Sequence, residues 1–114
     1  MSENVREVLE LAFFDIFGRE PDKVHIPEWN QWRDREIRFK RFLDTGTYVN
    51  AALMLVPEGW QCSIVIFSDG SSEAVLTDDR VNPVRLNDIE RMGDSPALAI
   101  AQAALAHTGK DGQG

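Results

Sequence analysis

The stretch WQCSIVIFSDGSSEAVLT, residues 60–77, decides the fold, because it places two strand-like runs on either side of an Asp-Gly pair. Such a pattern is typical of a β-hairpin. The alternation of polar and apolar side chains selects the loop, since a shift of one residue moves every side chain to the other face. A two-residue turn of Asp69 and Gly70 would mix polar and apolar residues on both faces. We therefore expect a three-residue loop of Ser68, Asp69 and Gly70, with Gly70 left-handed and a bulge.

One face of the hairpin is apolar in this register, which pairs Ile64 with Ala74 and Cys62 with Leu76. We expect that face to be the core of the domain and Cys62 to be a buried, unreactive thiol, because free cysteine often behaves as a small apolar residue. The expected core residues, taken from the hairpin and the last helix, are Trp60, Cys62, Ile64, Ile66, Leu76, Leu98 and Leu105.

A helix is expected over residues 4–18, where apolar residues recur at the spacing of one helical face and Gly18 offers a left-handed stop. Leu11 and Phe14 lie outside that face. Either the helix is covered on two sides, or these two residues offer a patch to a partner. We favour the first interpretation.

Three more helices are expected. One covers residues 28–44 after Pro27, a second covers 47–55 and ends before Pro57, and a third covers 95–108 after a serine-proline start. Residues 81–86 suit an edge strand, because Pro83 lacks an amide donor. Residues 109–114 are expected to form a flexible tail.

The chain of 114 residues fits a single domain. Its predicted fold class is α/β in the α+β sense: a small α/β sandwich with a mainly antiparallel sheet of two to four strands and about four helices. Within the domain, residues 1–46 form a helical N-terminal part and residues 47–108 form the sandwich core.

The formal net charge of −7 disfavours general adhesion to nucleic acid or anionic membranes. The distribution is uneven, however, because residues 33–41 carry a local charge of +3. The single cysteine cannot form an internal disulfide, and no secretory signal or bilayer-spanning apolar run is present. We expect a cytoplasmic protein.

The segments NAALMLVPEGW, residues 50–60, and SPALAIAQAAL, residues 95–105, resemble the phage ABA sandwich domain family, with the strand after Trp60 between them. The resemblance covers roughly residues 47–108. It implies a small α/β sandwich, with helices packed around a central sheet, encoded by a phage or prophage in a bacterial host. It implies no activity and no catalytic or binding residues.

Catalytic and metal-binding patterns are weak. Nucleophilic catalysis needs a nucleophile and an oriented base, but Cys62 lies on the expected core face, and His25 and His107 are far from it in the sequence. Zinc sites need several cysteine or histidine ligands at short spacing. The acidic stretch of residues 78–94 lacks the spacing of a calcium loop. We therefore expect neither an enzyme nor a cofactor.

The helix of residues 28–44 combines tryptophans with basic residues and is the one pattern compatible with nucleic acid, since arginines bind phosphates and exposed tryptophan stacks on bases. The alternative, which we favour, is an amphipathic helix with tryptophans in the core and arginines paired with Asp34, Glu36 and acidic neighbours. The candidate interaction surface comprises Phe14, Trp29, Trp32, Arg33, Arg35, Arg38, Lys40 and Arg41.

The expected function is that of a non-enzymatic phage accessory protein acting through an unidentified protein partner or self-association. The alternative is a nucleic-acid-binding accessory protein that uses the basic helix. We expect no membrane contact.

Overall fold

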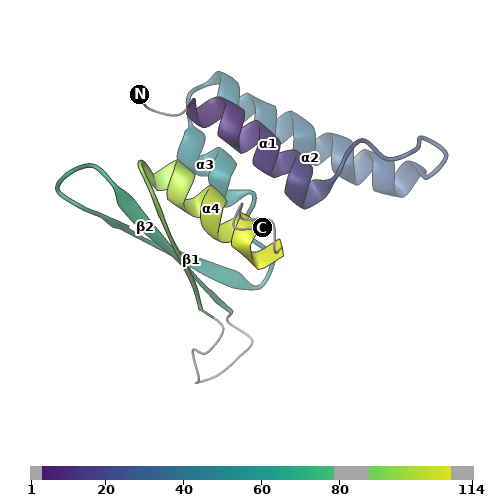
Figure 1. The fold of residues 1–114 in the computed structure, drawn as a ribbon. Coiled ribbons are helices and arrows are strands. Elements are labelled where there is room, and N and C mark those ends of the chain that lie inside the picture. Colours follow the sequence, from purple (N-terminus) through teal and green to yellow (C-terminus); the bar gives the residue numbers. More distant parts are fainter. Residues whose placement is uncertain (1–3, 79–87, 109–114) are drawn as a thin grey trace.

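The computed structural model describes residues 4–78 and 88–108, which form four helices and a three-stranded antiparallel sheet (Figure 1). The fold is a small α+β domain, as the sequence predicts. The elements in chain order are α1 (Val5–Phe17), α2 (Ile26–Asp44), α3 (Tyr48–Leu53), β1 (Trp60–Ile66), β2 (Ser72–Asp78), β3 (Ile89–Gly93) and α4 (Pro96–Thr108).

The sheet has the order β1-β2-β3, and its hairpin has the register that the sequence predicts. Ile64 pairs with Ala74, and Cys62 pairs with Leu76. The amide of Phe67 donates to the Ser71 carbonyl oxygen at 2.8 Å, and the amide of Gly70 donates to the Phe67 carbonyl oxygen at 2.9 Å. Gly70 has a φ of 93°, so the three-residue loop with a left-handed glycine is confirmed.

Helix α4 covers the sheet and packs against all three strands. Its alanine-rich sequence allows this close approach, and eight of its residues are buried. The approach is close at Gly93 of β3, where an added Cβ atom would lie 2.4 Å from the backbone nitrogen of Ala99. Only a residue without a side chain fits there.

Helices α1, α2 and α3 lie beyond α4, on the same side of the sheet (Figure 1). Helix α1 packs against α4 and α3, and Asn4 caps its start by accepting a hydrogen bond from the amide of Glu7. Helix α2 begins two residues earlier than expected, so that Pro27 lies inside its first turn. Phe13 connects α1 with α2. The centroid of its ring lies 4.7 Å from that of Phe39 and 6.1 Å from that of Trp32, both on α2.

The opposite face of the sheet is not covered by any described helix. Side chains that point to this face, such as Gln61, Ser63 and Met92, are exposed. In the part of the chain that the structure describes, the sheet therefore has one face covered by helices and one open face.

The core prediction is wrong at Ile66. Leu76, Leu98 and Leu105 are buried, whereas Trp60, Cys62 and Ile64 are half-buried against the core. Ile66 points to the same face, but 65% of its surface is exposed, whereas its partner Ser72 on β2 is fully buried. The difference arises because α4 lies over β2 and β3 more than over β1, the outer strand.

Two predictions fall on residues outside the described ranges: the edge strand over residues 81–86 and the tail over residues 109–114. Within residues 4–78 and 88–108, no helix is both long and apolar enough to cross a membrane.

Candidate interaction surface

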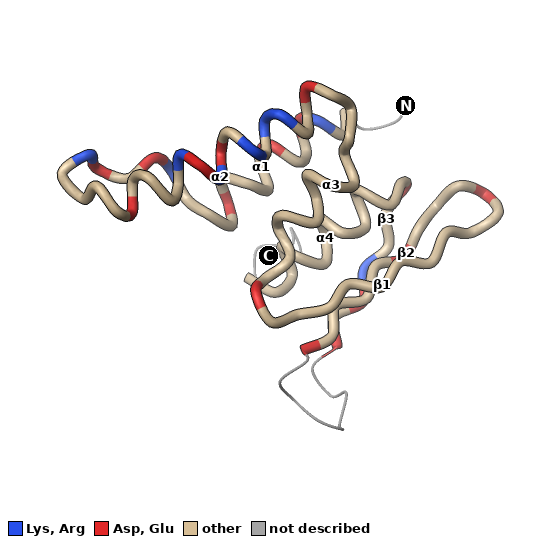
Figure 2. Tube along the Cα trace, turned by 180° about the vertical axis from the view of Figure 1, so that it is seen from behind, with Lys and Arg blue, Asp and Glu red and all other residues tan. Residues whose placement is uncertain are grey.

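The residues predicted to form an interaction surface lie on α2, except Phe14, which lies on α1. Figure 2 shows Lys and Arg concentrated on these two helices. Acidic residues alternate with them along the same segments, so the pair of helices presents mixed charge rather than a continuous basic stripe.

Trp32 does not belong to an accessible surface, which corrects the sequence prediction. Only 5% of its surface is exposed, and its indole nitrogen donates to the Gly18 carbonyl oxygen at 3.1 Å. Trp29 is half-buried, and its indole nitrogen donates to a Glu20 carboxylate oxygen at 2.9 Å. Because both indole N–H groups have partners within the domain, the two tryptophans serve packing rather than an open stacking platform.

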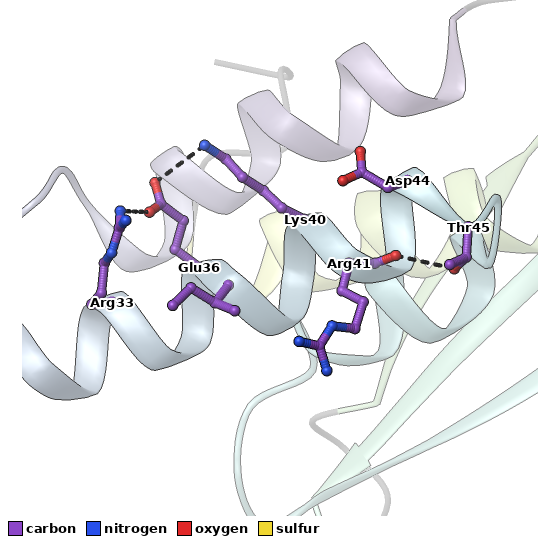
Figure 3. Close-up of a pocket in the computed structure, with 7 residues that line it drawn as sticks. Arg33, Glu36, Lys40, Arg41, Asp44 and Thr45 are labelled. Atoms are coloured by element: carbon purple, nitrogen blue, oxygen red, sulfur yellow. Dashed lines mark hydrogen bonds and ion pairs between the residues drawn. The ribbon is translucent and has the colours of Figure 1, made fainter.

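Glu36 is the centre of an ion-pair cluster on α2. Its carboxylate is largely buried and lies 2.9 Å from Arg33 Nη1 and 3.6 Å from Lys40 Nζ (Figure 3). The spacing of three and four residues places these side chains on one side of the helix. A buried carboxylate between two cations is neutralised locally, so both cations are engaged in the fold.

Two more basic residues of α2 contact their own domain. Arg38 pairs with Asp34 at 3.2 Å, and the guanidinium of Arg35 lies 4.4 Å from the ring centroid of Phe17 on α1. Arg41 lines a hollow of about 350 Å³ on α2 together with Arg33, Glu36, Ile37, Lys40, Asp44 and Thr45. Its side chain extends away from these neighbours (Figure 3), and within the described residues it has no ion pair.

Helix α1 presents a second apolar face, contrary to our expectation that it is covered on two sides. Leu11 is 61% exposed and Phe14 is 43% exposed. Both line a groove of about 630 Å³ beside α2, whose other lining residues are Asp15, Arg19, Glu20, Trp32 and Glu36. Leu11 and Phe14 together form the patch of the second alternative for this helix in the sequence, but the candidate interaction surface includes only Phe14. The signal was present, since Leu11 lies three residues before Phe14 and therefore on the same helical face.

The residues considered for catalysis do not come together. Cys62 is half-buried on β1, and burial raises the pKa of its thiol, which leaves less of the reactive thiolate at neutral pH. His107 packs edge-on against Trp60, with ring centroids 5.0 Å apart, and His25 precedes α2. Among the described residues, no group of three or more His, Cys, Asp or Glu side chains is arranged to hold a metal ion.

No family model matches the sequence, and neither the search of curated proteins nor that of solved structures returned a significant match.

Proposed function

We propose that this protein is a non-enzymatic binding module that receives an amphipathic helix of a partner protein in the groove between α1 and α2. The observation that carries the proposal is the exposed pair Leu11 and Phe14, which flanks this groove. Adjacent apolar residues at a groove are the usual recognition surface for the apolar face of a helix.

The charges of the groove indicate the chemistry of the partner. Its lining contains three carboxylates, on Asp15, Glu20 and Glu36, and one guanidinium, on Arg19. Glu36 is already neutralised by Arg33 and Lys40, which leaves Asp15, Glu20 and Arg19 with a net charge of −1. A partner helix with Lys or Arg beside its apolar anchors would complement this charge. The same charges disfavour a polyanion.

The nucleic-acid alternative has less support. Arg33, Arg38 and Lys40 are already in ion pairs, and phosphate binding would have to replace those contacts. From the resemblance in residues 47–108 alone, we further propose that the protein is an accessory protein encoded by a phage or prophage.

The test is a pull-down from host extract with the full chain, with and without nuclease. We expect a nuclease-resistant protein partner that is lost with Leu11→Glu or Phe14→Glu, because a carboxylate in the groove repels a basic helix and removes an apolar contact. Val24→Glu is the matched control, since Val24 is 75% exposed and lies in the connector outside the groove.

The purified partner should then bind the two groove variants at least tenfold more weakly, while all three variants keep the melting temperature of wild type. Binding that is unaffected by both groove variants, or that disappears with nuclease, would refute the proposal.

A further inference from the structure

The outer edge of β1 has no strand beside it in the part of the chain that the structure describes, because the sheet order is β1-β2-β3. Natural edge strands are commonly protected by charged side chains, proline or a bulge that bends the strand. Residues 60–68, WQCSIVIFS, contain neither a charged residue nor proline, and β1 pairs with β2 in continuous register (Figure 2). This edge can therefore accept another strand.

The hairpin register determines which backbone groups face outward. Phe67 donates to Ser71, so these two residues form a hydrogen-bonded pair. Bonded and non-bonded pairs alternate in an antiparallel ladder, so residues 61, 63 and 65 bond to β2. The amides and carbonyls of Cys62, Ile64 and Ile66 point to the open edge. The Trp60 amide also points outward, but it donates to the Pro57 carbonyl oxygen at 3.2 Å.

We propose that β1 pairs antiparallel with β1 of a second copy of this chain. Ile64 faces Ile64 of the second copy on the two-fold axis, and Cys62 faces Ile66 of the second copy. In this register the outward amides and carbonyls of Cys62, Ile64 and Ile66 all bond to the second copy. The Trp60 amide keeps its hydrogen bond to the Pro57 carbonyl oxygen. The two sheets then form one continuous sheet of six strands.

One observation favours a second copy as the occupant of this edge, and another favours this edge over the rest of the surface. Ile66 points to the helix-covered face yet is mostly exposed, and in the paired register it lies directly beside the half-buried Cys62 of the second copy. Each chain also has a formal net charge of −7, so two copies repel each other over most of their surface. The uncharged β1 edge is where that repulsion is weakest.

This interface is small, so the dimer should be weak, with a Kd on the order of 10 to 100 μM. Because the two copies have charges of the same sign, dimerisation should strengthen as salt rises. Sedimentation of the full chain as a function of concentration and salt measures both properties. A chain that remains monomeric at about 1 mM in high salt would refute the proposal.

Amide hydrogen exchange tests the pairing residue by residue. The amides of residues 61, 63 and 65 should be protected at every concentration. Those of Cys62, Ile64 and Ile66 should exchange quickly in dilute protein and at least tenfold more slowly in concentrated protein. Dimerisation without this alternating change would mean that another surface is used and would overturn the proposal. Protection of these amides only when an extended foreign peptide is added would likewise overturn it.

A disulfide tests the register. In Ile66→Cys, the introduced thiol should face native Cys62 of the second copy at a Cα separation of about 5.5 Å, which a disulfide can bridge. Mild oxidation should convert most of this variant into a covalent dimer.

Wild type and the control Val65→Cys should remain largely uncrosslinked, since Val65 points to the opposite face of the sheet. Equal crosslinking of all three proteins would contradict the register. Phe14→Glu should leave dimerisation unchanged, which separates this surface from the α1–α2 groove.

Discussion

Ile64 and Ile66 point to the same face of β1 but differ in what lies above them. Ile64 packs against the core, whereas Ile66 is mostly exposed on the outer strand even though its partner Ser72 on β2 is fully buried. Alternation along a strand predicts which face a side chain takes, and that part of the prediction holds. It does not predict how far the covering helix extends, because that depends on the length and placement of a distant element.

The two single variants Ile64→Asp and Ile66→Asp should therefore differ in stability, with Ile64→Asp the less stable protein. An unpaired carboxylate at Ile64 should lower the free energy of unfolding by about 3 kcal/mol or more, which largely prevents folding. At Ile66 the carboxylate remains in water, so dilute protein should melt within a degree or two of wild type. Urea denaturation of both variants provides the measurement. Equal destabilisation by the two substitutions would show that the assignment of the core boundary is wrong.

Gly93 lies at a close contact between the sheet and α4. Nothing in the sequence shows that this position requires glycine, since Gly93 is one glycine among eight. Gly93→Ala places a methyl group against the backbone of α4, which must then move. We expect a loss of about 1 to 3 kcal/mol and a Tm lower by roughly 5 to 10 °C. Met92→Ala is the control, since the neighbouring Met92 side chain is exposed. A Gly93→Ala protein as stable as this control would contradict the close approach.

At the scale of elements, α1 has two apolar faces and α2 has one. The inner face of α1 packs on α4, while Leu11 and Phe14 remain at the surface. Helical spacing identifies both faces of α1 in the sequence. It does not determine whether a second face is covered, because the covering element lies elsewhere in the chain.

The basic residues of α2 should not support binding of oligonucleotides. We expect no micromolar binding of labelled single- or double-stranded oligonucleotides at about 0.15 M salt, because Arg33, Arg38 and Lys40 are in ion pairs and the chain is acidic overall. In fluorescence anisotropy, the labelled oligonucleotide should keep its free value when wild type is added. The same result is expected for the triple variant Arg35→Gln, Arg38→Gln, Arg41→Gln. Wild-type binding that the triple variant abolishes would favour the nucleic-acid alternative.

For the whole molecule, the sequence predicts the α+β class, the four helices and the register of the β1–β2 hairpin. These properties follow from local patterns: helical spacing, strand parity and the loop at Gly70. The placement of every described helix on one side of the sheet follows from contacts between distant elements, so local patterns do not predict it. Local patterns do not predict the groove beside Leu11 either, because residues of both α1 and α2 line it.

The contact between α1 and α4 has a consequence for the order of events on the ribosome. Translation proceeds at roughly 5 to 20 residues per second, so α4 is made several seconds after α1. During this interval the buried face of α1 lacks the surface that α4 provides, although Phe13 can already pack on Phe39 of α2. The nascent chain therefore exposes part of an apolar helix until α4 has been synthesised, and cellular chaperones have that interval in which to bind it.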